Sequence, residues 1–388
     1  MIRRSAFALA LAATLAVPAF ALDETFATEK VKIRVETVAQ GLDHPWGIAF
    51  LPDGNFLVTE RPGFLRIVTP EGKIGNAIYG VPQVDARGQG GLLDVALDPD
   101  FAENRLVYLS YAEKGEAPEN KSKNGTAVAR GHLTESLSPQ LQDVEVIFRQ
   151  QPKLPSTLHF GSRLVFDREG HLFITMGERS KKEFRGQAQD LSSHLGKIVR
   201  IWPDGTVPDD NPFADPDNAA GALPEIWSWG HRNVQGAALH PETGRLWENE
   251  HGPRGGDEVN ILEPGKNYGW PVVTYGTEYS GLPVGSGESA APGMEQPVHY
   301  WVPSIGPSGM AFYTGDAIPE WKGDLFVGGL ARPGLYRLSL DGETVTHEEP
   351  LLKDLGLRIR DVAQGPDGTL YLLTDEEDGQ ILRIVKAD

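Results

Sequence analysis

Polar residues that could do chemistry are concentrated in residues 230–270, which read GHRNVQGAALHPETGRLWENEHGPRGGDEVNILEPGKNYGW. This segment contains a His-Arg-Asn triplet, a Gly-Pro turn and an acidic pair, namely His231, Arg232, Asn233, Gly252, Pro253, Asp257 and Glu258. The surrounding runs are typical of short β-strands. Polar groups on strand ends and turns are often functional, because a rigid scaffold positions them. The segment therefore predicts a site.

The composition limits what this site can do. The 388 residues include no Cys, which excludes a thiolate nucleophile, an iron–sulfur cluster and a zinc site with Cys ligands. Catalysis must then come from His, carboxylates, Arg or a bound cofactor. The net charge of −18 argues against nucleic acid as a partner, because phosphate binding needs clustered Lys and Arg.

Two arginines form a local exception to the acidic charge. Arg358 and Arg360 flank Ile359, so on a strand their side chains point to the same face. Like charges on one face repel each other unless an anion lies between them. Two parallel guanidinium groups can bind a carboxylate bidentately. We therefore expect an anion-binding site here.

The first 21 residues have the pattern of a secretory signal. Arg3 and Arg4 form a basic start, residues 7–17 an apolar stretch, and Ala19-Phe20-Ala21 a cleavage site of the small-x-small type. We expect export with cleavage near Ala21. The apolar stretch is too short for a stable membrane span, and no other segment approaches transmembrane length.

One phrase recurs six times in varied form, as an apolar strand, a turn and an aromatic-rich strand. The copies begin at Trp46, Leu92, Ser162, Val234, Ser308 and Arg360. Turn dipeptides such as Asp53-Gly54 and Asp367-Gly368 separate alternating apolar and polar runs, as in β-hairpins. Such repetition, with 45 Gly and 29 Pro, predicts an all-β, six-bladed β-propeller. A pair of β-sandwiches would also give short strands, but does not explain six copies.

The propeller is expected to be one domain over residues 22–388, with residues 31–38 pairing with residues 380–385 to close the ring. The 40% of hydrophobic residues suffice for its core. Residues near the start of each phrase should meet at one mouth of the central channel. The polar members of this group are Gln89, His159, Arg163, Glu178, His231, Arg232, Asn233, Arg358 and Arg360.

Several segments occur in an order that resembles a known family. They are GQGGLLDVALDPDF, HFGSRLVF, MGER, GHRNVQG, NEHGPRGGDEVN, GKNYGWP and RIRDV. Over residues 35–385 the chain resembles the soluble glucose/sorbosone dehydrogenases that depend on pyrroloquinoline quinone (PQQ), and within that family the periplasmic aldose sugar dehydrogenases. The resemblance implies a propeller with PQQ over the channel mouth and a Ca²⁺ ion beside it. It also implies oxidation of the C1 hydroxyl of an aldose to a lactone.

The resemblance assigns catalytic roles. His159 matches a catalytic His that takes the proton of the sugar hydroxyl while hydride moves to the quinone, as suits a base with a pKa near neutrality. Glu178 stands where a carboxylate beside this base is often Asp. Arg232 corresponds to an Arg near the reacting carbonyl, where a cation stabilises developing negative charge.

Further residues are implied as ligands of the cofactor and the metal. PQQ contacts are expected from Gln89, Arg232, Asn233, Arg358 and Arg360. Where related glucose dehydrogenases use a Lys, this chain has Ala331, and the adjacent Arg332 is the candidate replacement. The carbonyls of Gly252 and Pro253 match Ca²⁺ ligands, with oxygen atoms that suit this ion. Asp257 and Glu258 are expected as direct or supporting groups of the metal, and the resemblance also implies a further ion that uses Glu258 and the Tyr268 carbonyl. The alternative is that the two carboxylates form a solvated acidic pair.

Two other classes of function stay open at this point. A propeller lactonase or hydrolase would use Ca²⁺ and carboxylates without a quinone, and a non-catalytic periplasmic propeller would only bind. For a dehydrogenase, an aldose mono- or oligosaccharide and an external electron acceptor, such as a quinone, a cytochrome or a dye, are the expected partners. The Gly- and Pro-rich loop at residues 274–308 is expected to line the sugar side.

Overall fold

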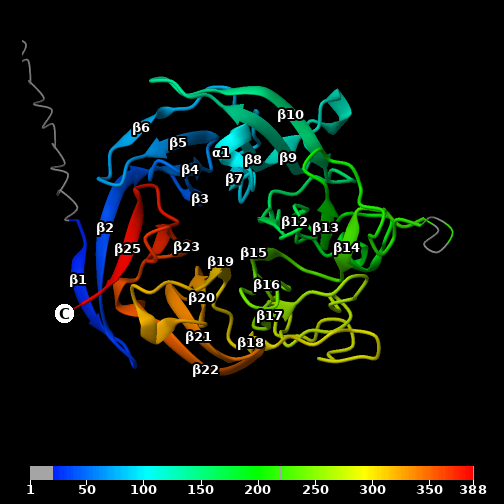
Figure 1. Cartoon of the computed structure of the whole chain (residues 1–388). Helices are drawn as coiled ribbons and strands as arrows, with labels where there is room; N and C mark the ends of the chain where they lie inside the picture. Colours follow the sequence, from blue (N-terminus) through cyan, green and yellow to red (C-terminus); the bar gives the residue numbers. More distant parts are fainter. Residues whose placement is uncertain (1–20, 216, 218–220, 388) are drawn as a thin grey trace, which may run out of the picture.

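The strands form a ring of six antiparallel sheets in the part of the chain that the computed structural model describes, residues 21–215, 217 and 221–387 (Figure 1). Each sheet is one blade. In five blades the first strand lies next to the central opening, and in the sixth, which also contains the first strands of the chain, β23 (Ile359–Gln364) has this place. The predicted six-bladed β-propeller is therefore confirmed. The predicted export signal falls almost wholly in residues 1–20, which lie outside the described residues.

The first three blades follow one another along the chain, each with four strands in its sheet. Blade 1 contains β3 (Pro45–Phe50), β4 (Phe56–Glu60), β5 (Phe64–Val68) and β6 (Ile74–Ala77). Blade 2 contains β7 (Leu92–Leu97), β8 (Leu106–Lys114), β9 (Asn124–Leu133) and β10 (Leu141–Arg149). Blade 3 contains β11 (Leu164–Phe166), β12 (Leu172–Thr175), β13 (Lys197–Ile201) and β14 (Ile226–Trp229).

The last three blades complete the ring. Blade 4 contains β15 (Val234–Leu239), β16 (Leu246–Glu250), β17 (Asp257–Ile261) and β18 (His299–Trp301). Blade 5 contains β19 (Pro307–Phe312), β20 (Leu325–Gly329), β21 (Gly334–Asp341) and β22 (Thr344–Leu351). Blade 6 contains β23 (Ile359–Gln364), β24 (Leu370–Thr374) and β25 (Gly379–Lys386), joined by β2 (Lys32–Leu42) and β1 (Asp23–Ala27).

Each recurring phrase of the sequence forms the two inner strands of one blade. The phrase that begins at Trp46 gives β3 and β4, and the phrase at Arg360 gives β23 and β24. These strands are buried along most of their length, as the runs FLVTE of β4 and LYLLT of β24 illustrate. Apolar contacts between neighbouring blades form the core, so the repeats pack as a ring and not as two stacked sheets.

The ring closes by pairing the first part of the chain with the last. β2 pairs antiparallel with β25, in a register that places Ile33 opposite Lys386 and Leu42 opposite Gly379. The predicted pairing of residues 31–38 with residues 380–385 is confirmed. β1 adds an outer strand beside β2 that the sequence pattern did not indicate (Figure 1).

A charged triad joins the inner strands of blades 2, 3 and 6. Arg163 Nη1 lies 2.9 Å from Asp94 Oδ1, and Arg163 Nη2 lies 3.0 Å from Asp361 Oδ1. Asp94 also accepts the backbone N–H of Leu164 at 2.8 Å, and Asp361 that of Ile48 at 3.3 Å. Each aspartate thus bonds the backbone of the next blade, so the triad fastens the blade 2–3 and blade 6–1 contacts.

Helical segments are short within the described ranges. They are α1 (Phe101–Asn104) and the 3₁₀ turns η1 (Pro118–Asn120), η2 (Arg185–Gln189), η3 (Pro319–Trp321) and η4 (Lys353–Leu355). Among these described segments, none has the length and apolar character needed to cross a membrane.

Candidate active site

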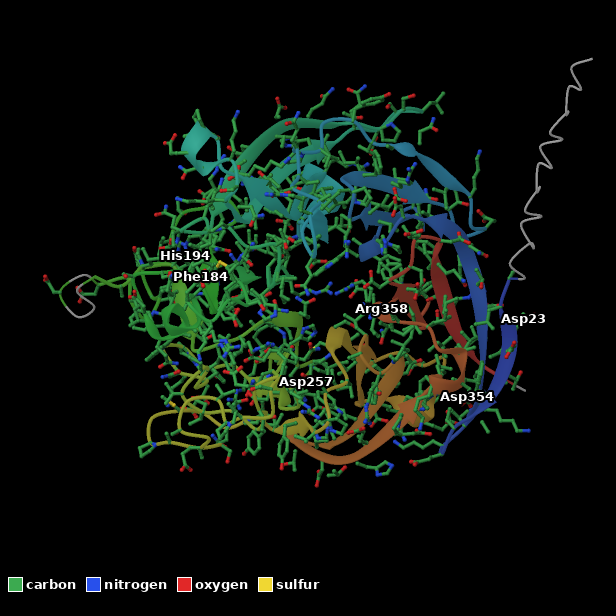
Figure 2. The ribbon with its side chains drawn as sticks, turned by 180° about the vertical axis from the view of Figure 1, so that it is seen from behind. Asp23, Phe184, His194, Asp257, Asp354 and Arg358 are labelled. Carbon is green, nitrogen blue, oxygen red and sulfur yellow. The ribbon has the colours of Figure 1, made fainter. Side chains whose placement is uncertain are left out.

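A polar cavity of about 260 Å³ opens where the inner strands of several blades begin. We call it the site cavity. Among the residues expected at the channel mouth, those that line it are Gln89, His159, Arg232, Arg358 and Arg360. Gly252, Pro253 and Asp257 line it as well. Glu178, His231 and Asn233 are buried behind this surface. In Figure 2, Arg358 lies beside the central opening, whereas Phe184 lies toward the outside of the ring.

His159 and Glu178 form a buried pair on blade 3. Nδ1 of His159 lies 2.8 Å from Oε2 of Glu178, so the N–H at Nδ1 donates to the carboxylate and Nε2 is the basic nitrogen. Burial lowers the pKa of His159, and Arg232 acts in the same direction, against the raising effect of Glu178. Burial opposes ionisation of Glu178, but the facing His159 outweighs it and the pKa of Glu178 is lowered. The site thus contains a neutral imidazole held by a carboxylate.

The backbone around His159 is held in an uncommon conformation. His159 has φ 51°, in the left-handed region that non-glycine residues seldom adopt. Its N–H donates to Oε1 of Gln89 at 2.8 Å, while the N–H of Gln89 donates to the carbonyl of Thr157 at 2.8 Å. A Cβ at Gly177 would lie 2.3 Å from the His159 carbonyl, so this position requires glycine. Gln89 therefore positions the base in addition to lining the cavity.

Arg232 precedes β15 and extends along the cavity wall. Its Nη1 donates to the carbonyls of His251 at 2.9 Å and Gly252 at 2.6 Å. Its guanidinium carbon lies 5.1 Å from the centroid of the Trp270 ring, within range for a cation–π contact. Its Nε is buried and has no hydrogen-bond partner among the described residues. Arg232 therefore presents a fixed cation with an unused N–H.

His251 is a site residue that sequence reasoning missed. It lines the cavity, its Nε2 lies 2.7 Å from the Pro307 carbonyl, and its Nδ1 lies 3.3 Å from Nδ2 of Asn233. Burial, with help from His159 and Arg232, lowers the pKa of His251 to about 3. The ring is therefore neutral. Its position between Glu250 and the Gly-Pro turn was the available signal.

Asp257 supports the Gly252-Pro253 turn from behind. Oδ1 of Asp257 accepts the N–H of Gly252 at 2.8 Å, and Oδ2 accepts the N–H groups of Ile305 and Gly306, each at 2.8 Å. Burial raises the pKa of Asp257, against these backbone N–H groups. Both carboxylate oxygens thus bind backbone, which orients the turn carbonyls and suits Asp257 to a supporting role.

Glu258 and Tyr268 lie apart from this surface, on a much smaller cavity next to it. Glu250, Arg232 and Gly252 also line that cavity. Burial and the neighbouring Glu250 raise the pKa of Glu258 well above its usual range. The Glu258 carboxylate and Tyr268 thus lie on the same small cavity, which is consistent with the further cation site predicted for these two residues.

His231, which was expected at the channel mouth, is instead buried in this layer and does not line the site cavity. Its Nδ1 lies 3.1 Å from Oε1 of Glu250, its Nε2 lies 2.9 Å from the Ser228 hydroxyl, and its ring stacks on Tyr268 at 4.8 Å. His231, Glu248 and Glu250 bring their ligand atoms within 4.8 Å of one another. These buried residues pack within blade 4, next to Arg232.

Arg358 and Arg360 meet an anion supplied by the protein. Oδ2 of Asp375 lies 2.9 Å from Arg358 Nη2 and 2.8 Å from Arg360 Nη2. Burial opposes ionisation of Asp375, but the two arginines outweigh it and lower its pKa. The anion expected between the arginines is thus Asp375, so their repulsion alone does not require an external carboxylate.

The same part of the cavity still carries a surplus of positive charge. Arg61 lines the cavity beside Arg358, Arg360 and Asp375, and its pKa is lowered mainly by burial. The Nε atoms of Arg61 and Arg360 are buried and have no hydrogen-bond partner among the described residues. Three guanidinium groups face one carboxylate here. Arg61 was not expected from the sequence.

Ala331, and not Arg332, lines the cavity at the position discussed for a replaced Lys. The Arg332 side chain is exposed, and its backbone N–H donates to the Ile305 carbonyl at 3.0 Å. The contact of Arg332 with a cofactor stays a prediction that this geometry does not favour.

Comparison with known proteins places this geometry among sugar dehydrogenases. The family model described as Glucose / Sorbosone dehydrogenase matches residues 42–383. Aldose sugar dehydrogenase YliI of Escherichia coli K12 is 48% identical over 95% of this chain and 97% of its own length. A solved glucose dehydrogenase is 53% identical, with a TM-score of 0.86 over 91% of this chain and 99% of that chain. The PQQ-bound aldose sugar dehydrogenase of Streptomyces coelicolor is 31% identical, with a TM-score of 0.74 over 92% and 98%.

Proposed function

The chain belongs to the glucose/sorbosone dehydrogenase family, and on this premise we propose that it is a periplasmic quinoprotein that oxidises the C1 hydroxyl of aldoses to lactones. The relatives named as sugar dehydrogenases, and the PQQ-bound structure among them, support an oxidoreductase of this type. Electrons would leave to an external acceptor, either a quinone, a cytochrome or a dye.

The charge of the site cavity fits PQQ, which carries three carboxylates. Arg61, Arg232 and Arg360 each have a buried Nε–H without a hydrogen-bond partner among the described residues, and all three line the cavity. A buried, unpaired donor on a cation is costly unless a ligand accepts its hydrogen bond. Arg358 and Gln89 complete the set that would hold the cofactor. The unpaired guanidinium donors are the single observation that carries the proposal.

The Gly252-Pro253 turn fits Ca²⁺ by the chemistry of its donors. Its carbonyl oxygens are the hard ligands that calcium favours, and Asp257 fixes the turn from behind. Asp257 would support the ion and not bind it directly. Glu258 and Tyr268 would hold a further ion in the adjoining small cavity. When bound, PQQ supplies the two-electron acceptor and Ca²⁺ the Lewis acid that polarises it.

His159 would act as the general base. Its Nε2 accepts the proton of the C1 hydroxyl, and Glu178 then stabilises the imidazolium through the bond at Nδ1. Gln89 fixes the backbone of the base through the His159 N–H. The buried surroundings keep the imidazole neutral before each turnover.

Arg232 would stabilise the negative charge that develops as the sugar C1 is oxidised. A fixed guanidinium is effective here because it needs no reorganisation during the reaction. Its anchor on Trp270 and on the carbonyls of His251 and Gly252 holds it at the cavity wall. Asn233, which binds the Gly161 N–H at 3.2 Å, would support the loop that follows the base.

Reconstitution with PQQ and Ca²⁺ tests the proposal. The loaded protein should show the absorbance of bound quinone and reduce an artificial dye when an aldose is added. His159→Ala should lower dye reduction by about 10³-fold while PQQ still binds. Sugar-independent dye reduction, or none at all in protein that has bound PQQ, would remove the dehydrogenase assignment. Lactone hydrolysis without PQQ would instead favour the Ca²⁺-dependent hydrolase.

A further inference from the structure

Arg179 follows Glu178 in the chain and is completely buried, although it has no part in the proposed mechanism. Its Nη2 donates to the Asn124 amide oxygen and to the Ser156 carbonyl, while its Nε and Nη1 have no hydrogen-bond partner among the described residues. Asp85 reaches it only through Asn124, whose Nδ2 donates to Asp85 Oδ2 at 2.9 Å. A buried cation to which no carboxylate is bonded is costly, so its presence here calls for a role.

Arg179 holds the segment that leads to His159. We call residues 156–160 the base loop. In return for the bond from Arg179 Nη2 to its carbonyl, Ser156 donates its hydroxyl to the Arg179 carbonyl at 2.6 Å. Oγ of Ser156 also accepts the N–H of Leu158 at 3.3 Å. The start of the base loop is therefore fixed by Arg179.

The guanidinium also packs on the residue that follows His159. Cζ of Arg179 lies 3.6 Å from the centroid of the Phe160 ring, which is a close cation–π contact. Phe160 is buried in a cluster with Trp46 and Leu93, and these three residues line the site cavity. Arg179 itself does not line that cavity, so it reaches the site only through the base loop.

One side chain thus holds the base loop on both sides of His159. His159 has φ 51° and Gly161 φ 65°, and Arg179 itself has φ 73°. A non-glycine residue keeps such a conformation only where its surroundings impose it. Gln89 binds the His159 N–H, and Arg179 secures the flanking residues. A displacement of about 1 Å at a catalytic group can cost a hundredfold in rate, so this restraint matters for a base.

The charge of Arg179 acts on the imidazole as well. The charged or titratable side chains that act on His159 are Glu178 and Arg179 on blade 3, Arg232 before β15 and His251 after β16. Burial is the main cause that lowers the pKa of His159, and Arg232 and Arg179 add to it against Glu178. Burial lowers the pKa of Arg179 to about 9, against Glu178, so the guanidinium is charged at neutral pH.

We propose that Arg179 is a positioning residue of the base: through Ser156 and Phe160 it fixes the loop on both sides of His159, and it places an unpaired positive charge near the imidazole. This inference rests on the proposed function, because it takes His159 as the base. Arg179 has no contact with the sugar, PQQ or the metal in this role. The base is then held at its N–H by Gln89, at Nδ1 by Glu178 and along its loop by Arg179.

Histidine NMR of the whole protein, without PQQ or sugar, tests the effect of the charge. The His159 signal is identified by its loss in His159→Ala, and its titration is followed in Arg179→Met, Arg179→Lys and Arg200→Met. Arg200 is the matched control, because it is buried in blade 3, stacks on Trp227 at 4.3 Å and does not line the site cavity. We expect His159 to titrate at higher pH in Arg179→Met and as in wild type in the other two variants. An unmoved titration in Arg179→Met would overturn the inference, as would an equal shift in Arg200→Met.

Kinetics of the protein loaded with PQQ and Ca²⁺ test the positioning. We expect kcat for glucose to fall about a hundredfold in Arg179→Met and about tenfold in Arg179→Lys, with KM and PQQ affinity unchanged. Lysine keeps the charge but has no planar group to stack on Phe160. Arg200→Met should keep the wild-type kcat.

The Lys variant decides the case in which Arg179→Met does not fold. A reduced kcat with an unmoved His159 titration would support the positioning role, and a wild-type kcat would overturn it. Absence of turnover in the wild-type protein would overturn the proposed function. The titration, which needs neither cofactor nor sugar, keeps that result separate from the effect of Arg179 on His159.

Discussion

The Glu178 carboxylate accepts a hydrogen bond from Nδ1 of His159 at 2.8 Å, and Glu178 itself is completely buried. Both residues belong to blade 3, and β11 and β12 lie between them in the sequence. The blade hairpin therefore brings the base and its carboxylate together. The hydrogen bond shows that a Glu side chain, one methylene longer than Asp, reaches the imidazole from this position.

Replacing Glu178 by Gln should separate the orienting role of the carboxylate from its charge. We expect kcat to fall about a hundredfold, because the imidazolium loses its stabilising anion. In wild type, burial lowers the pKa of His159 below 6.5, so kcat/KM should fall only below that pH. Glu178 raises this pKa, and its loss should move the acid limb to lower pH. A pH–rate profile measures both effects, and a limb that moves to higher pH would contradict this role.

Asp257→Asn should weaken the metal site without removing a ligand. An amide cannot accept hydrogen bonds on both sides, so it loses either the Gly252 N–H or the N–H groups of Ile305 and Gly306. We expect Ca²⁺ to bind about 10- to 100-fold more weakly by calorimetry in the presence of PQQ. Asp53→Asn, in an exposed turn of blade 1, is the matched control. Equal affinities in the two variants would exclude the supporting role.

Asp375→Asn should destabilise the protein, because Arg360 would be buried without its anion. We expect a loss of about 3 kcal/mol in the free energy of unfolding at pH 7. The native pKa of Asp375 lies below that of the unfolded chain, so its contribution is complete above about pH 4 and is lost as the pH falls through the native pKa. Urea unfolding at several pH values checks this. A deficit that stayed constant down to pH 3 would contradict it.

Arg163→Met should destabilise the protein, because the buried carboxylates of Asp94 and Asp361 would lose the cation that they share. Burial raises the pKa of Asp94 to about 6 and also raises that of Asp361, and in both cases Arg163 opposes the rise. Without Arg163 we expect a loss of about 3 to 5 kcal/mol at pH 8. Raised native pKa values mean that the native state takes up protons, so the deficit should be smaller at pH 5. Thermal unfolding at the two pH values measures the difference, and equal deficits would exclude the effect.

The fold could be predicted because its unit repeats in the sequence. Six hairpin phrases gave the inner strands, and the pairing of β2 with β25 followed from the need to close the ring. The outer strand β1 could not be predicted, because its run DETFA has little apolar character and is mostly exposed. Because most of β1 is exposed, its sequence lacks the alternation of apolar and polar residues that marks a half-buried strand.

Site residues that belong to a sequence motif could be predicted. Residues that reach the site only because the fold brings distant blades together could not be predicted as readily. Asp375, His251 and Arg61 were missed, since each gains its position through a contact between blades. A signal for Asp375 was present: the inner hairpins of four blades end in an acidic residue, at Glu60, Glu178, Glu250 and Asp375. Aligning the phrases with one another would have predicted a carboxylate at this end of blade 6.

The pairing of Ile33 with Lys386 sets the order in which the molecule can form. Blades 1 to 5 are built from neighbouring strands, so their hairpins can form as synthesis proceeds. β2 pairs with β25, which follows every other described strand in the sequence, so this contact carries the largest loop-closure entropy. A chain that ends before β25 would leave β2 and β24 with unpaired edges prone to association. The ring can therefore close only after all six blades have been synthesised.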